Sequence, residues 1–210
     1  VKIAFHQLCF QCHITVGEFR GSIGNGDLAT YGRRPAVARQ VDSLINRSFG
    51  ESSSDLDRAG AHLLIAGGKR LRPAVVMLSA DAVKHGSSSD ILPAALALEL
   101  IHTFTLVHDD IMDDDSMRRG VPTVHTKWDM PTGILAGDVL YARAFEFLCI
   151  AIATENAKVR AVSMLARACA EICAGQHMDM SFEKRHTWRG DVRTPARPSS
   201  VPWRKHHVAH

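Results

Sequence analysis

Helical patterning along most of the chain constrains the fold more than any other feature of the sequence. Apolar residues recur at helical spacing from Val37 to Phe49, and Ala and Leu are abundant between residues 56 and 182. Breaks divide this pattern into further helices at about 56–66, 73–85, 91–113, 131–152 and 155–182. Val-rich alternating runs, which would indicate strands, are nearly absent. We therefore predict an all-α fold in which these helices form a bundle.

Both ends of the chain depart from this pattern. Residues 1–35 lack sustained periodicity and contain the glycine-rich breaker Gly21–Gly26. From His186 onward the sequence has three prolines, many Arg and His, and no apolar stripe, and the prolines exclude a long helix. We predict an irregular segment at 1–35, a folded part at 36–185 and a non-homologous basic tail at 186–210.

The net charge of +3 does not by itself indicate a nucleic-acid partner, because the charge is unevenly spread. From Lys184 to the end there are seven Lys/Arg and one Asp, a local charge of +6, which leaves about −3 for the rest. No apolar run reaches the roughly 18 residues that span a bilayer, and residues 1–20 do not form a secretory signal. We expect a cytoplasmic protein without a membrane span or a nucleic-acid partner.

Five cysteines, an odd number in a chain without a visible signal, indicate reduced thiols. Cys9-Phe-Gln-Cys12-His13 matches the attachment pattern of c-type haem, and the same residues with His6 could bind zinc. Haem attachment needs export, and matches of this length arise easily by chance. Neither cofactor is therefore the preferred interpretation.

An aspartate box, formed by Asp109, Asp110 and Asp113, closes the predicted helix at 91–113. Asp109 and Asp113 are four residues apart, so both project from one helical face with Cβ atoms roughly 6 Å apart. Two such carboxylates repel each other unless a divalent cation lies between them. Magnesium often binds through one or two carboxylates plus substrate phosphates. His102 lies on the same stripe. The box predicts a magnesium-bound diphosphate site, and a solvated acidic helix end is the alternative.

A basic segment follows a glycine pair in Gly67-Gly-Lys-Arg-Leu-Arg-Pro73. Lys69, Arg70 and Arg72 place three cations within four positions, and Pro73 suits the first turn of a helix. Flexible backbone, positive charge and a helix N-terminus together favour a phosphate. The spacing is not that of a P-loop. A solvated basic surface is the alternative.

Two further motifs are less informative alone. Arg118 and Arg119 follow Asp113 by five and six residues, so they either neutralise the aspartate box or clamp diphosphate oxygens. Gln176 and Asp179 share one face of the last predicted helix.

Taken in order, these segments resemble the trans-type prenyl diphosphate synthases, also called the polyprenyl synthetase family. The resemblance covers residues 36–185 and lies in four segments: 67–73, 99–125, 134–148 and 175–183. It implies the helical bundle of the isoprenoid synthases, usually a homodimer. It also implies a magnesium-dependent condensation of isopentenyl diphosphate with an allylic diphosphate.

The resemblance further implies a role for each matching side chain. Isopentenyl diphosphate would lie on Lys69, Arg72, His102 and Arg119, with Arg70 nearby and Gln176 as a further substrate-binding candidate. Magnesium would bind Asp109 and Asp113, with Asp110 supporting them, and Arg118 would bind the allylic diphosphate.

The residue types suit this chemistry. Magnesium and arginine would stabilise charge on the departing diphosphate, and an apolar pocket would protect the allylic cation from water. Phe104 lies roughly 7 Å deeper along the helix than Asp109. An aromatic there, with no insertion in the box, resembles geranylgeranyl diphosphate synthases, while core packing is the other explanation. A terpene cyclase also uses such a box, but the basic segment and the arginine pair favour a second diphosphate substrate.

The second aspartate-rich motif of the family, and the Lys-Thr segment before it, do not appear after Arg185. The sequence therefore predicts a partial, truncated isoprenoid synthase bundle. Because the metals must be held from both sides of the cavity, we expect weak or no prenyl transfer by this chain alone. A noncatalytic diphosphate-binding fragment or subunit is the alternative function.

Overall fold

The structure is a computed structural model that describes residues 26–50, 54–84, 90–152 and 154–185. Helices account for nearly all of its elements, which confirms the all-α prediction. The helices are α2 (Gly26–Phe49), α3 (Asp55–Ile65), α4 (Leu71–Val83), α5 (Leu92–Met112), α6 (Val124–Lys127), α7 (Met130–Ala151) and α8 (Glu155–Arg185). Two short strands, β1 (Met117–Arg118) and β2 (Val121–Pro122), form one antiparallel hairpin.

Helix α2 begins nine residues before the predicted boundary at residue 35. It therefore includes Pro35 and part of the segment expected to be irregular. Its buried side chains recur every four residues, at Val37, Val41, Ile45 and Phe49, which is the pattern read from the sequence. The haem or zinc motif at Cys9–His13 and the tail at 186–210 lie outside the described residues.

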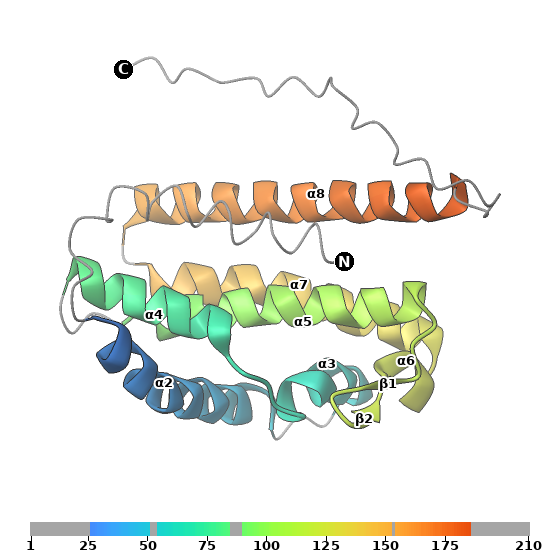
Figure 1. Cartoon of the computed structure of the whole chain (residues 1–210), viewed down its shortest axis with the longest axis horizontal. Helices are drawn as coiled ribbons and strands as arrows, with labels where there is room; N and C mark the ends of the chain where they lie inside the picture. The colour runs from blue at the N-terminus through green and yellow to red at the C-terminus, as the bar shows by residue number, and fades with distance from the viewer. Residues whose placement is uncertain (1–25, 51–53, 85–89, 153, 186–210) are drawn as a thin grey trace, which may run out of the picture.

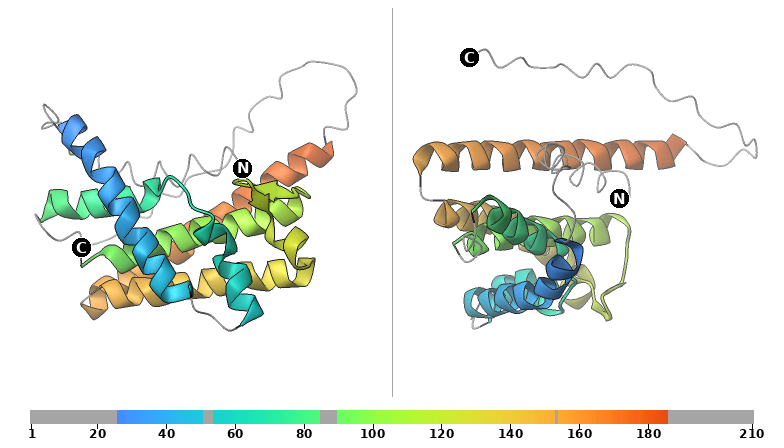
Figure 2. Two further views of the ribbon diagram at one scale, coloured as in Figure 1. Left: turned by 90° about the horizontal axis from the view of Figure 1, so that it is seen from below. Right: turned by 60° about the vertical axis from the view of Figure 1, so that its left-hand side comes forward.

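Helices α5 and α7 form the centre of the molecule and lie side by side along much of their length (Figure 1). Helix α8 lies on one side of this pair, whereas α2 and α3 lie on the other, and the right-hand view of Figure 2 shows the same layering. Leu96 and Leu100 of α5 and Leu140 of α7 are completely buried. In the described part of the chain, no helix is both long and apolar enough to span a membrane.

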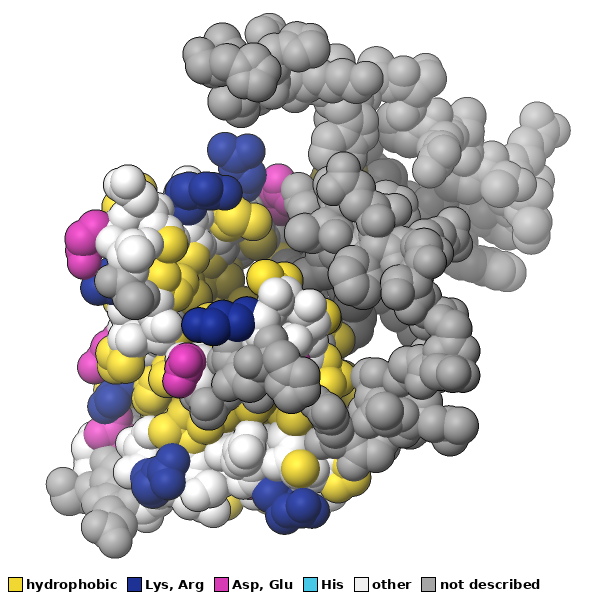
Figure 3. Space-filling model, turned by 90° about the vertical axis from the view of Figure 1, so that its left-hand side faces the viewer, with side chains coloured by type: hydrophobic (Ala, Val, Ile, Leu, Met, Phe, Trp, Pro, Cys, Tyr) yellow, Lys and Arg dark blue, Asp and Glu magenta, His cyan; other side chains and the backbone are white. Residues whose placement is uncertain are grey.

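Some apolar side chains near the ends of helices are in contact with solvent. Val83 at the end of α4 is 90% exposed, and Ile150 near the end of α7 is 65% exposed. Figure 3 shows one end face of the molecule, where hydrophobic side chains lie among Lys, Arg, Asp and Glu side chains. On α8, Cys169 is buried, whereas Cys173 is exposed.

Glycines on α7 allow α5 to approach closely near the aspartate box. The ring of His108 rests against Gly137, where an added Cβ would lie 2.2 Å from His108 Nε2. The same nitrogen donates a hydrogen bond to the carbonyl oxygen of Ile134 at 3.0 Å. This contact fixes the end of α5 that bears the aspartates against the first turns of α7.

Replacing Gly137 with Ala should destabilise the fold, because the new methyl group would overlap the His108 ring. Overpacking of this kind costs about 1–3 kcal/mol in the free energy of unfolding. Gly60 of α3 provides a matched control, since an added Cβ there meets no atom closer than 3.7 Å. Gly60→Ala should be neutral or stabilising by about 0.5–1 kcal/mol, because Ala favours the helix. Chemical denaturation of both variants measures the difference, and equal effects would contradict the close contact.

Candidate diphosphate and magnesium site

The aspartate box lies at the C-terminal end of α5. Asp109 is 8% exposed, and Asp113 is the exposed residue that caps the helix. The amide of Asp113 donates a hydrogen bond to the carbonyl oxygen of Asp109 at 2.8 Å, so the two residues keep helical spacing. Burial and the nearby charge of Asp113 raise the pKa of Asp109 to about 6. A divalent cation bound between the two carboxylates would relieve the repulsion between Asp109 and Asp113.

Asp110 points away from this pair and into the protein. Its side chain is fully buried and accepts a hydrogen bond from Nε of Arg118, while its Oδ2 has no partner among the described residues. Burial raises the pKa of Asp110, and the hydrogen bond from Arg118 opposes that rise. This contact holds Arg118 beside the box, whereas the sequence analysis expected Asp110 to support magnesium binding.

The two arginines lie on the hairpin that follows α5. Arg119 and Gly120 form its two-residue turn, and both have positive φ, at 54° and 79°. This is the type I′ geometry that matches the twist of a hairpin. Arg118 on β1 faces the aspartate box, whereas Arg119 at the turn reaches towards α3.

Arg119 connects the hairpin to the glycine pair. Its Nη1 donates hydrogen bonds to the carbonyl oxygens of Leu63, at 3.0 Å, and Gly67. An added Cβ at Gly68 would lie 3.2 Å from the same nitrogen, so the guanidinium lies against a residue without a side chain. Gly67 has φ of 92°, a conformation that favours glycine. These contacts account for both glycines before the basic segment.

A pocket of about 400 Å³ lies where the basic segment, α5 and the hairpin meet. It is lined by all five residues that the resemblance places on or near isopentenyl diphosphate, whereas Gln176, a further substrate-binding candidate, is not part of the lining. The lining consists of Ala66, Gly67, Gly68, Lys69, Arg70, Leu71, Arg72, Glu99, His102 and Arg119. Helix α4 begins at Leu71, so the positive end of its dipole also lies at this pocket. The pocket therefore combines several cations with a helix N-terminus.

Both burial and the positive charges of the pocket act on His102. Burial, followed by the charges of Arg72, Arg119, Arg118 and Arg70, lowers the pKa of His102 to about 3. The imidazole is therefore uncharged at neutral pH, and can donate one hydrogen bond without adding to the charge. A diphosphate bound in the pocket would offset the charges of the arginines that surround His102.

Two predicted residues lie elsewhere. Gln176 is half-buried on α8, and it does not line this pocket. Phe104 faces α7, where its ring centroid lies 4.9 Å from that of His108 and 5.2 Å from that of Tyr141. Tyr141 in turn contacts Phe145. Sequence reasoning missed Tyr141, although its spacing of four from Phe145 could have indicated an aromatic face on that helix.

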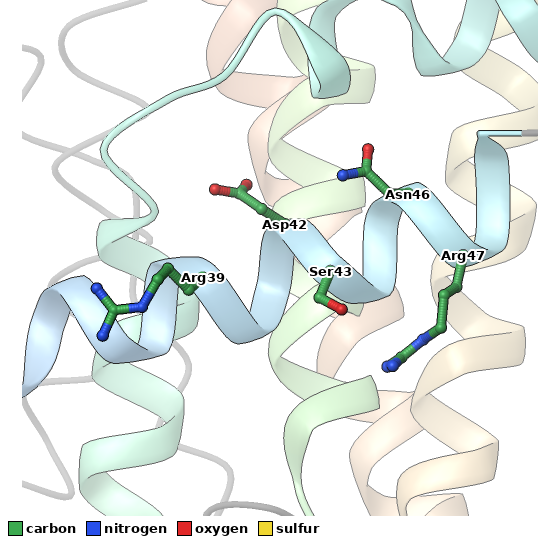
Figure 4. A pocket seen from close by; sticks show the side chains of 5 residues that line it. All are labelled: Arg39, Asp42, Ser43, Asn46 and Arg47. Carbon is green, nitrogen blue, oxygen red and sulfur yellow. The ribbon is translucent and has the colours of Figure 1, made fainter.

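A second hollow has a different character. Arg39, Asp42, Ser43, Asn46 and Arg47 line it, and all five extend from α2 (Figure 4). It mixes both signs of charge on one exposed helix face. Asp42 links it to the basic pocket, because its carboxylate accepts a hydrogen bond from Nε of Arg70.

The donor set at the aspartate box suits magnesium better than a metal that needs many protein ligands. Within the described ranges, no group of three or more His, Cys, Asp or Glu side chains could hold a metal ion. Asp109 and Asp113 supply two carboxylates on one face, and magnesium usually retains waters and substrate phosphates as its other ligands. The residues present therefore fit magnesium bound together with a phosphate ligand.

The protein is thus an all-α bundle with an aspartate box at one end of the central helix α5 and a basic pocket along the same helix. The family described as polyprenyl synthetase matches residues 53–194. The chain belongs to this family.

Individual relatives agree with the family match. A geranylgeranyl pyrophosphate synthase of Geoglobus acetivorans is 54% identical over 153 residues, which is 73% of this chain and 47% of that protein. A geranylgeranyl diphosphate synthase of Saccharolobus solfataricus is 44% identical over 165 residues, 78% of this chain and 49% of the relative. The chain thus spans about half the length of these relatives.

Solved structures show the same relationship. The geranylgeranyl pyrophosphate synthetase from Geoglobus acetivorans matches with a TM-score of 0.70 and 52% identity, over 74% of this chain and 51% of that one. The corresponding enzyme from Pyrococcus horikoshii matches with a TM-score of 0.68 and 41% identity, over 74% of this chain and 48% of that one. The fold is therefore that of part of a prenyl synthase bundle.

The lowered pKa of His102 predicts a pH dependence of stability. Between about pH 3 and 6.5, the unfolded chain binds a proton at His102 that the folded chain does not, so stability rises with pH. His102→Gln should remove this contribution, which amounts to at most about 1.4 kcal/mol per pH unit. Denaturation between pH 4.5 and 6.5 measures it. His177→Gln, on the exposed face of α8, is the control. An unchanged slope in His102→Gln would contradict the assignment.

Proposed function

We propose that this chain takes part in prenyl transfer, the condensation of isopentenyl diphosphate with an allylic diphosphate. One observation carries the proposal: the central helix α5 contributes His102 to a cationic pocket and Asp109 to the aspartate box at its C-terminal end. A reaction that joins two diphosphate substrates needs two anion sites at a fixed separation. Asp109 follows His102 by seven positions, which sets an axial spacing of about 10 Å.

Isopentenyl diphosphate is the ligand we assign to the basic pocket. Lys69, Arg72 and Arg119 supply positive charge, and the neutral imidazole of His102 supplies a hydrogen bond. This substrate keeps its diphosphate during the reaction. A site built from fixed side-chain cations suits a diphosphate that must be held and not released.

The allylic diphosphate is assigned to the aspartate box. Asp109 and Asp113 would hold magnesium, which supplies charge stabilisation for the departing diphosphate. Arg118, held by Asp110, lies beside the box, where it can contact diphosphate oxygens that the metal does not reach. When the bond between the allylic carbon and oxygen breaks, its electrons leave with the diphosphate. The isopentenyl double bond then attacks the allylic carbon, and loss of a proton restores a double bond.

A geranylgeranyl-type product is favoured for this site. Phe104, on the side of α5 that faces α7, contacts His108 and Tyr141 and forms an aromatic cluster along the path expected for a growing chain. The names of the relatives from Geoglobus acetivorans and Saccharolobus solfataricus agree with a product of this length. A homodimer, usual in the family, is the assembly we propose.

Asp109→Asn should abolish magnesium-dependent binding of an allylic diphosphate, because the metal loses one of its two carboxylates. The measurement is the thermal shift caused by geranyl diphosphate, with and without magnesium. Asp114→Asn is the matched control. It removes the same charge from an exposed neighbour whose φ of 54° Asn adopts readily. A magnesium-dependent shift that survives Asp109→Asn would contradict the metal site.

Turnover tests the proposal directly. Labelled isopentenyl diphosphate and geranyl diphosphate should give longer prenyl diphosphates only with magnesium, and Asp109→Asn should abolish them. We expect a low rate, because within the described residues the acidic groups placed to hold the metal lie at one end of α5. Binding of both substrates without any product would instead assign the chain as a noncatalytic diphosphate-binding subunit.

A further inference from the structure

Arg70 differs from every other cation in the basic pocket because its side chain is buried. The residue is 3% exposed, and protein acceptors already engage its guanidinium. Nε donates to Asp42 at 2.8 Å, Nη1 donates to Glu99 at 2.8 Å, and Nη2 donates to the carbonyl oxygen of Leu64 at 2.6 Å. Three elements, α2, α5 and the end of α3, therefore meet at one side chain.

Glu99 is an unexpected residue in the wall of a pocket for an anion. Its side chain is 3% exposed, and it lies one helical turn before His102 on the same face of α5. An unpaired carboxylate here would repel a diphosphate and would also be costly to bury. Arg70 removes both problems, because it pairs with Glu99 within the protein. The positive potential of Lys69, Arg72 and Arg119 is then directed at the pocket.

The backbone at Arg70 shows why this position matters for its neighbours. Arg70 precedes α4 with φ of 47° and ψ of 37°, the left-handed backbone conformation that residues other than glycine rarely adopt. This conformation turns the chain between Lys69, which is exposed, and Arg72, which is half-buried at the pocket. The three hydrogen bonds of Arg70 stabilise that turn.

We propose that Arg70 is a positioning residue, which with Glu99 and Asp42 holds the segment that presents Lys69 and Arg72 to the diphosphate and does not bind the diphosphate itself. This inference rests on the proposed function of the pocket. It assigns two acidic residues, Glu99 and Asp42, to the binding site through their contact with Arg70. Hydrogen bonds within the protein already use three of the five N–H groups of the guanidinium, and the residue is only 3% exposed at the pocket wall, so few donors remain for a ligand.

Calorimetric titration of the full chain with inorganic diphosphate in EDTA measures binding. Thermal unfolding and amide exchange of residues 67–74, both without ligand, measure how well the segment is held. Lys69→Met represents the loss of a direct ligand. It should weaken diphosphate binding about tenfold or more, with unchanged unfolding temperature and amide exchange. Arg70→Met should weaken binding by a similar factor, lower the unfolding temperature and speed the exchange. Arg58→Met, which removes an exposed arginine from α3, is the control and should change nothing.

The double variant Arg70→Met with Glu99→Met keeps the experiment informative if Arg70→Met fails to fold. Replacing a buried ion pair with apolar residues of similar size is often neutral. The double variant should therefore recover the unfolding temperature and bind diphosphate within about threefold of the original chain. Recovery of stability without recovery of binding would identify Arg70 as a direct ligand and overturn the proposal. Unchanged binding in Arg70→Met would overturn it as well. Failure of the unmodified chain to bind diphosphate would instead contradict the proposed function.

Discussion

The close packing of α5 against α7 is the constraint on which the rest of the site depends. Gly137 admits the ring of His108 at a distance that no larger residue allows, and this contact fixes the end of α5 that bears the aspartates. Because α5 is a continuous helix, the same contact also fixes Glu99 and His102 at the basic pocket. The separation of the two anion sites is therefore a property of one helix.

Charged groups of the same sign gather at two places along α5. Asp109 and Asp113 lie at its C-terminal end, where burial and the charge of Asp113 raise the pKa of Asp109. Nearer the middle of α5, burial and the charges of four arginines lower the pKa of His102. We propose that magnesium binds at the first place and a diphosphate at the second. The buried acidic residues Asp110 and Glu99 pair with Arg118 and Arg70 within the protein, so their negative charge is compensated there.

The local sequence pattern predicted most of the long helices and the residues that gather at the pocket. Periodicity located α3, α5 and α7 closely, and the motifs named Lys69, Arg72, His102 and Arg119, which do line one pocket. The local pattern could not predict contacts between elements that are distant in the sequence. Burial of Arg70 depends on acceptors from α2, α3 and α5, and Tyr141 meets Phe104 only because α7 lies beside α5. The start of α2 was also missed, because Pro35 and the glycines before it indicate a break that the helix does not make.

The basic pocket is proposed to bind a diphosphate without magnesium. A crystal structure of the chain grown with inorganic diphosphate in EDTA would show whether it does. We predict density for the diphosphate between Lys69, Arg72, His102 and Arg119, with Arg70 still bonded to Glu99. Diphosphate bound elsewhere, such as along α2, with the basic pocket empty at saturating concentration, would rule out this binding site.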